Sequence, residues 1–308
     1  MFGLKRVCFL CHLFVLIVKD VMSWVVPPKK KSIGDDVILI TGGGRGIGKK
    51  LVLEFATHQP KHIIIWGRTE ECLAATVSEV RKMNINCSYM ICDVSSREEI
   101  YSMAKEVEAK FGNVTLLVNN AGVVFPNSVL ESSPQQTEQT IRTNVLAHFW
   151  TIRAFLPPML EQKRGHIVNM SSMLGWAGLN GASDYCSSKF AACGLSEALY
   201  DELTRDGDSG VTVTAVYPYH VDNSMFAGVA TRFPSLFPSI KEDYVALKIV
   251  EAVLTNRNKV LLPKLMYAVA FFYSIAPVAA VTSIMKLLGV NKAMEQYHDH
   301  HRKLHGHS

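Results

Sequence analysis

The sequence has little of the charge pattern that nucleic-acid binding requires. Its 32 lysines and arginines against 27 acidic residues give a net charge of +5 at pH 7, and the basic residues are spread along the 308 residues without a long run. A nucleic-acid-binding protein gathers its basic side chains on one face or in one segment. The composition argues against a nucleic-acid partner and fits a mild attraction to an anionic membrane surface.

A paired cysteine pattern of the kind that binds metal is also missing. The chain has seven cysteines, an odd number, and their spacing shows no metal-site pattern. We therefore expect no metal site and a reducing, cytosol-facing compartment. Cys8 and Cys11 form a C-x-x-C inside an apolar stretch, which indicates burial in a membrane rather than redox chemistry.

The N-terminus lacks an uninterrupted hydrophobic run long enough to span a bilayer. Val7–Val18 is free of charge but covers about 18 Å as a helix, against roughly 30 Å of hydrocarbon. Extending it to Val26 encloses two charged residues. A signal peptide is the rival interpretation, but no small-x-small cleavage site follows. We expect an uncleaved anchor with a basic linker over residues 1–31, followed by a cytosolic domain.

The C-terminal segment, residues 263–308, begins with a second apolar run. Leu265–Met285 carries no charge and contains Pro277, which ends or kinks a helix. This run either dips into a membrane or forms helices that cover a pocket. Five histidines lie in the last eleven residues; because a metal site needs fixed geometry, we expect a disordered tail there.

Residues 32–262 alternate between short β-rich runs and helical stretches. The runs are Val37–Ile40, Ile63–Trp66, Ser88–Ile91, Leu116–Val118, His166–Val168 and Val211–Thr214. This alternation predicts a single α/β domain of the Rossmann type, with a doubly wound parallel sheet. Such sheets bind their ligands at the carboxyl ends of the strands.

A glycine-rich turn follows the first predicted strand directly, and a helix is predicted from Lys49 to His58. The turn comprises Thr41, Gly42, Gly44, Arg45, Gly46, Ile47 and Gly48. Glycine lets the backbone approach a pyrophosphate, and a helix N-terminus offers unpaired N–H groups and partial positive charge. This strand, turn and helix predict a dinucleotide cofactor.

The end of the second predicted strand lacks the acidic residue that selects NAD by binding the ribose 2′-hydroxyl. Gly67 and then Arg68 stand there instead. Arg68 and Arg45 can both pair with a 2′-phosphate. We therefore expect NADP(H) in preference to NAD(H), which stays possible.

Tyr185 and Lys189 are four residues apart, and Ser172 lies thirteen residues before the tyrosine. Positions i and i+4 share one face of a helix. An ammonium about 4 Å from a phenol favours the phenolate by up to roughly 4 kcal/mol at an effective dielectric constant near 20. Lys189 is therefore expected to lower the pKa of Tyr185. Beside a dinucleotide, this pair predicts hydride transfer.

Together with Asn119-Asn120-Ala121-Gly122, these motifs resemble the short-chain dehydrogenase/reductase family, over about residues 36–262. The resemblance implies a tetrad in which Tyr185 donates a proton to a carbonyl oxygen, Ser172 holds that oxygen, Lys189 binds the nicotinamide ribose and Asn144 positions a water. It further implies a possible homodimer. The other cofactor contacts that it implies are Asp93, Asn119, Ala121, Gly122, Tyr185, Pro218, Val221 and Ser224.

One segment departs from the family pattern. Tyr219 replaces a glycine, and Ser224 lies one place beyond the usual threonine position, which Asn223 occupies. Which of these two polar residues contacts the nicotinamide carboxamide stays open.

The segment Met225–Pro238 is apolar and aromatic and suits a lid over a lipophilic substrate. With the apolar ends of the chain, it resembles the membrane-bound branch of epidermal-type retinol dehydrogenases and retinal reductases. That resemblance implies all-trans-retinal and all-trans-retinol as substrates, at the endoplasmic reticulum membrane or lipid droplets. A 17β-hydroxysteroid or other lipid-alcohol dehydrogenase and a non-catalytic lipid-droplet or membrane scaffold stay open as alternatives.

Overall fold

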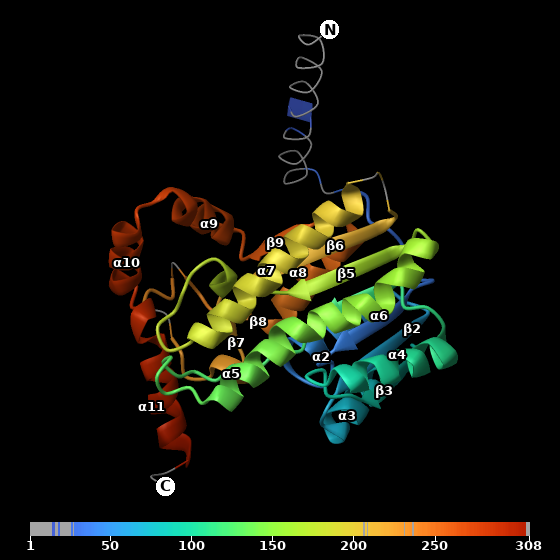
Figure 1. The fold of residues 1–308 in the computed structure, drawn as a ribbon, viewed down its shortest axis with the longest axis horizontal. Helices are drawn as coiled ribbons and strands as arrows, with labels where there is room; N and C mark the ends of the chain where they lie inside the picture. Colours follow the sequence, from blue (N-terminus) through green and yellow to red (C-terminus); the bar gives the residue numbers. More distant parts are fainter. Residues whose placement is uncertain are drawn as a thin grey trace.

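Seven parallel strands form one sheet in the computed structural model of the chain (Figure 1). The spatial order is β3-β2-β1-β4-β5-β6-β9. The chain adds β2 and β3 on one side of β1 and then crosses to add β4 on the other side, so the order of the strands reverses between β1 and β4. The strands are β1 (Val37–Thr41), β2 (His62–Gly67), β3 (Cys87–Ile91), β4 (Leu116–Asn119), β5 (Gly165–Met170), β6 (Val211–Pro218) and β9 (Lys259–Leu262). Such a reversal is where doubly wound folds bind ligands.

The structure describes residues 14, 15, 18, 26, 28–205, 207, 209–230, 232–235 and 237–305. The expected N-terminal anchor and its Cys8 and Cys11 pair therefore lie outside the described residues, apart from isolated positions and residues 28–31. The side chain of Ser224 also lies outside what is described.

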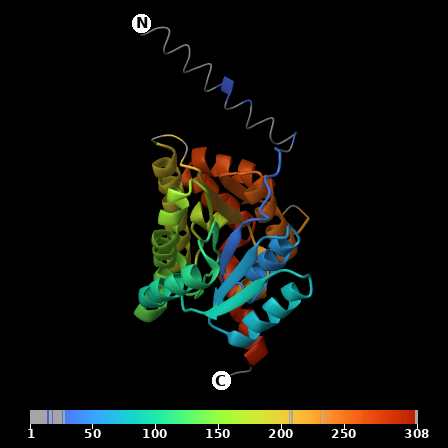
Figure 2. The ribbon, with the colours of Figure 1, turned by 90° about the vertical axis from the view of Figure 1, so that its right-hand side faces the viewer.

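Helices cover both faces of the sheet (Figures 1 and 2). One apolar core joins Ile38 and Ile40 of β1 to α2, α3 and α8. A second core joins Leu39 to α4, α6 and α7 on the other face, because successive side chains of a strand point to opposite faces. The helices are α2 (Gly46–Ala56), α3 (Glu70–Arg81), α4 (Arg97–Phe111), α5 (Pro134–Ile141), α6 (Ala147–Glu161), α7 (Ser183–Thr204) and α8 (Glu242–Leu254).

Short elements connect this framework. They are the π-helical turn η1 (Arg142–Leu146), the 3-10 turns η2 (Met173–Gly175), η3 (Ser224–Phe226) and η4 (Val290–Lys292), and the paired strands β7 (Val221–Asp222) and β8 (Ile240–Lys241). Turn η1 separates α5 from α6, and such π-turns often occur at functional sites.

All six predicted strands are confirmed. The helix after the glycine turn begins at Gly46 rather than Lys49, directly at the end of the turn. Strand β9 was not predicted. It is only four residues long, and nothing in its local sequence separates it from the end of a buried helix.

Three C-terminal helices lie together beyond the carboxyl ends of the strands (Figure 1). They are α9 (Leu265–Ile275), α10 (Val278–Leu287) and α11 (Ala293–His305). Pro277 caps α10, so the predicted break is confirmed. The disordered tail expected over the last eleven residues is helical as far as His305, within α11. Within the described part of the chain, no helix combines the length and apolar character needed to cross a bilayer.

Candidate active site

One cavity of about 1110 Å³ lies at the carboxyl ends of the central strands. The glycine turn lines it at one side, and side chains of α9, α10 and α11 line it at another. The predicted site residues that line it are Gly42, Gly44, Arg45, Gly46, Ile47, Gly48, Arg68, Asp93, Ala121, Gly122, Ser172, Tyr185, Lys189, Pro218 and Val221. Three others, Thr41, Asn119 and Asn144, are buried behind its wall.

Within the glycine turn, the backbone of Gly48 lies close to that of Gly42, and the start of the turn lies close to the end of β4. Gly42 has a φ of +68°, which favours glycine, and a Cβ on Gly48 would lie 2.1 Å from the carbonyl oxygen of Gly42. The hydroxyl of Thr41 accepts hydrogen bonds of 3.0 Å from the backbone N–H groups of Asn120 and Ala121. The turn is thereby fixed to the end of β4.

The N-terminus of α2 fits a pyrophosphate. Its N-cap residue Arg45 makes no side-chain capping bond, and the first turn holds no acidic residue. Unpaired backbone N–H groups at a helix start bind phosphate oxygens. These residues therefore fit a dinucleotide.

Two guanidinium groups border the cavity near the ends of β1 and β2. Arg45 and Arg68 are both exposed and line the cavity. Arg68 lies 3.9 Å from the carboxylate of Asp93. That carboxylate also accepts hydrogen bonds from the backbone N–H and hydroxyl of Ser95, so it is held by the loop and not by the arginine alone.

Tyr185 and Lys189 share one face of α7, as predicted. The Lys189 ammonium lies 5.4 Å from the centroid of the Tyr185 ring and donates a hydrogen bond of 2.9 Å to the carbonyl oxygen of Met170. Both side chains are buried. Burial lowers the pKa of Lys189 to about 8.

The prediction that Lys189 lowers the pKa of Tyr185 is wrong. Burial raises the pKa of Tyr185, although a hydrogen bond with Ser172 acts in the opposite direction. The ammonium lies over the ring, whereas the predicted effect requires an ammonium about 4 Å from the phenol oxygen. Tyr185 therefore holds its proton at neutral pH.

The two adjacent serines have different partners. Ser171 donates a hydrogen bond of 2.8 Å to the carbonyl oxygen of Lys189, so its hydroxyl ties β5 to α7. Ser172 accepts a hydrogen bond of 3.1 Å from the backbone N–H of Leu174 and donates one of 3.5 Å to the carbonyl oxygen of Pro218. Its hydroxyl also interacts with the Tyr185 phenol and acts to lower the pKa of that phenol. The geometry places Ser172 rather than Ser171 beside the phenol.

Asn144 lies on the π-helical turn η1 and links two walls of the site. Its amide oxygen accepts from the backbone N–H of Val123 at 2.8 Å, and its amide nitrogen donates to the carbonyl oxygen of Val123 at 2.9 Å. The same nitrogen donates to the hydroxyl of Ser188 at 3.0 Å. Asn144 thus fixes the loop after β4 to α7, and both of its amide hydrogens are used.

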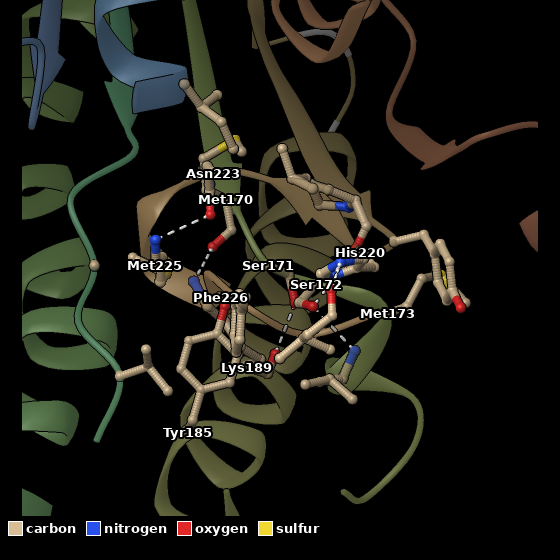
Figure 3. Close-up of a pocket in the computed structure, with 18 of the residues that line it drawn as sticks. Met170, Ser171, Ser172, Met173, Tyr185, Lys189, His220, Asn223, Met225 and Phe226 are labelled. Atoms are coloured by element: carbon tan, nitrogen blue, oxygen red, sulfur yellow. Dashed lines mark hydrogen bonds between the residues drawn. The ribbon is translucent and has the colours of Figure 1, made fainter. Parts of the chain in front are cut away.

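Helix α11 forms a wall of the site that was not predicted, whereas helices that cover a pocket were one of the two alternatives expected for Leu265–Met285. Met294 of α11 belongs to an apolar cluster with Tyr185 and Phe226, and Tyr297 also lines the cavity. Figure 3 shows the ring of Phe226 beside that of Tyr185. The spacing of Met294 and Tyr297 on one helix face was the available signal.

No cluster of three or more His, Cys, Asp or Glu side chains suited to a metal ion occurs among the residues that the structure describes. The site therefore combines a glycine turn that fits a dinucleotide with the phenol of Tyr185, the hydroxyl of Ser172 and the ammonium of Lys189. This fold and site define a nicotinamide-dependent oxidoreductase that acts on CH–OH groups.

The sequence profile described as short chain dehydrogenase matches residues 36–232. The chain belongs to the short-chain dehydrogenase/reductase family. It is 43% identical to human short-chain dehydrogenase/reductase 3, over 94% of this chain and 96% of the relative. It is 37% identical to retinol dehydrogenase 10 of Xenopus tropicalis, over 88% of this chain and 87% of the relative.

Two solved structures agree with the fold and with a nicotinamide cofactor. A short-chain dehydrogenase/reductase from Burkholderia phymatum in complex with NAD is 26% identical, with a TM-score of 0.71 over 79% of this chain and 94% of that chain. A metagenomic short-chain oxidoreductase in complex with NADP is 27% identical, with a TM-score of 0.64 over 75% and 97%.

Proposed function

We propose that the chain is an NADP(H)-dependent enzyme that interconverts all-trans-retinal and all-trans-retinol, acting as a reductase. The observation that carries this proposal is one continuous cavity. It joins the glycine turn to the buried Tyr185 and to an apolar wall from α9 and α10. The likeness to retinol dehydrogenase 10 supports a retinoid among lipophilic carbonyl compounds.

The roles of the four polar residues follow from their contacts. Because burial raises the pKa of Tyr185, its phenol is protonated at neutral pH and can donate that proton to a carbonyl oxygen. Ser172, which shares a hydrogen bond with Tyr185, holds the same oxygen. Lys189 binds the nicotinamide ribose, and Asn144 fixes the loop beside it. A bound NADPH supplies the hydride.

The preference for NADPH rests on Arg45 and Arg68. Both guanidinium groups line the cavity, and Gly67 stands where an acidic residue would select NAD. Planar guanidinium groups bind phosphate oxygens bidentately. They would stabilise a 2′-phosphate that NADH lacks.

We further propose that the enzyme works at the endoplasmic reticulum membrane or a lipid droplet, with residues 32–262 in the cytosol and residues 1–31 as the anchor. Several apolar side chains of the C-terminal segment 263–308 are exposed, among them Phe271, Ile275 and Val278. Apolar patches of this kind mark contact with a membrane or partner. A lipophilic substrate would then reach the cavity beside α9 and α10.

The test is NADPH oxidation by membrane-embedded protein with all-trans-retinal, compared with NADH and with Tyr185→Phe. Retinal reduction that prefers NADPH and depends on Tyr185 is the expected result. Estrone and a long-chain fatty aldehyde are assayed in parallel, since a steroid or another lipid alcohol would suit an apolar wall equally. Turnover of those compounds without retinal would contradict the retinoid assignment, and an absence of turnover with all of these compounds would point to a scaffold.

A further inference from the structure

Glu242 places a carboxylate beside the proposed pyrophosphate site. It is the first residue of α8, which packs against α2, and it lines the same cavity as the glycine turn. A Cβ on Gly46 would lie 3.3 Å from Oε1 of Glu242. Because Gly46 begins α2, this carboxylate borders the helix start whose N–H groups would bind phosphate oxygens.

An acidic side chain is an unexpected neighbour for an anion site. The first turn of α2 holds no acidic residue, which suits a phosphate, but α8 brings Glu242 to the same place. A pyrophosphate is itself an anion, and a nearby like charge disfavours the ionised form of a carboxyl group. A bound pyrophosphate and an ionised Glu242 would therefore destabilise each other.

The charges around Glu242 already favour its protonation in the free chain. Burial raises the pKa of Glu242, and the carboxylates of Asp243 on α8 and Asp222 on β7 act in the same direction. Lys50 of α2 and hydrogen bonding by Asn223 act to lower this pKa. The ammonium of Lys50 is also paired with Asp243 at 2.8 Å, so Glu242 shares this cation with another carboxylate. An arriving phosphate would raise the pKa of Glu242 further.

We propose that Glu242 takes up one proton when the nicotinamide cofactor binds, so that a neutral carboxyl group borders the bound pyrophosphate. The proton comes from solvent and adds to one carboxylate oxygen. The neutral group has an O–H donor, which suits a phosphate oxygen that the ionised group would repel. Glu242 thus sets the affinity for the cofactor and its dependence on pH. The inference rests on the cofactor of the function proposed above and not on its retinoid substrate.

The direction of the pH effect follows from the proton balance. The pKa of the carboxyl group is higher in the complex than in the free chain, so the complex binds more protons. Binding is therefore strongest below the free pKa and weakens as the pH rises through the bound pKa. Uptake of one proton corresponds to about a tenfold loss of affinity per pH unit between these two values. The 2′-phosphate of NADP(H) acts in the opposite direction, because it gains its second negative charge near about pH 6.

The test is titration calorimetry with NADP⁺, and with NAD⁺, which lacks the 2′-phosphate, between about pH 5.5 and pH 8.5. Buffers of different ionisation enthalpy report the number of protons taken up on binding. Wild-type protein should take up close to one proton within this range. Glu242→Gln should remove the uptake and bind either nucleotide about tenfold more tightly at pH 8. Glu251→Gln is the matched control and should behave as wild type, because Glu251 lies on the same helix outside the cavity and is paired with Lys248.

Three results would overturn the proposal. They are wild-type binding without proton uptake at any pH in this range, uptake that persists in Glu242→Gln, and weaker binding by a folded Glu242→Gln at pH 8. The first of them needs no variant, so it decides the matter even where Glu242→Gln fails to fold. The retinoid function fails separately, if wild-type protein binds a nucleotide but reduces no retinal. If NAD⁺ binds and NADP⁺ does not, the preference for NADP(H) fails, and the NAD⁺ titration still decides the role of Glu242.

Discussion

The ring of Phe226 packs edge-on against the ring of Tyr185, with centroids 5.6 Å apart and an interplanar angle of 79°. Phe226 lies on η3, directly after β7, and Tyr185 lies on α7. Met294 of α11 completes the same apolar cluster. Two segments that are distant in sequence thus pack in one cluster with Tyr185, and burial raises the pKa of its phenol.

Replacing Phe226 with alanine should weaken the use of a long apolar substrate. The loss of one aromatic contact is worth about 1.5 kcal/mol, which corresponds to roughly a tenfold lower kcat/KM with retinal. A short aldehyde, which does not reach this wall, should be affected less. Steady-state kinetics with both substrates is the measurement. Leu130→Ala, at a side chain 97% exposed, is the control and should leave both values unchanged.

The parts of the site that were predicted correctly are those that a local pattern encodes. The glycine turn, the pair Tyr185 and Lys189, and the six strands each depend on spacing within a few residues. The spacing of Met294 and Tyr297 marks one face of a helix, but the part of the fold against which that face packs depends on contacts with residues far along the chain, including Gly181, and no local pattern contains those contacts. The direction of the Tyr185 pKa was missed because its burial depends on packing with residues distant in sequence, among them Phe226 and Met294.

Alanine should be harmful at Gly48 and favourable at Gly194. A Cβ at Gly48 would lie 2.1 Å from the carbonyl oxygen of Gly42, whereas a Cβ at Gly194 would meet nothing within 4 Å. Gly48→Ala should distort the turn and abolish NADPH binding. Gly194→Ala lies inside α7 and should stabilise the fold by about 0.5–1 kcal/mol. Fluorescence titration with NADPH and thermal unfolding measure the two effects; tight binding by Gly48→Ala would contradict the assigned role of the turn.

Arg68→Ala should raise the KM for NADPH by roughly 10- to 100-fold, since a hydrogen bond to a charged group contributes about 1.5–3 kcal/mol. The KM for NADH should hardly change, because NADH carries no 2′-phosphate. Arg97→Ala, which removes another exposed arginine outside the cavity, is the matched control. An equal loss with both cofactors would show that Arg68 acts on the shape of the site rather than on the phosphate.

The rate of retinal reduction should fall as the pH rises through about 8. Burial lowers the pKa of Lys189 to about 8, so the ammonium that assists the proton supply is present below this pH and lost above it. The profile of kcat against pH at saturating NADPH measures the inflection. Lys189→Arg stays charged in this range, so any activity that it retains should lack the inflection. A wild-type profile that is flat to pH 10 would contradict the role of the ammonium.

Lys189→Met should make the fold more stable at pH 7 while it removes activity. The pKa of Lys189 is lowered from 10.5 to about 8 by burial, so the folded chain binds this proton less tightly than the unfolded chain. A difference of this size costs about 3 kcal/mol below pH 8, and the loss of the hydrogen bond to Met170 offsets about 1 kcal/mol of the gain. The penalty disappears between pH 8 and about 10.5, because the free energy of unfolding rises with pH wherever the unfolded state binds more protons. Urea unfolding should therefore show that the free energy of unfolding of the variant exceeds that of the wild type by about 2 kcal/mol at pH 7 and by much less at pH 10. A variant that is less stable than the wild type at pH 7 would mean that the ammonium stabilises the fold.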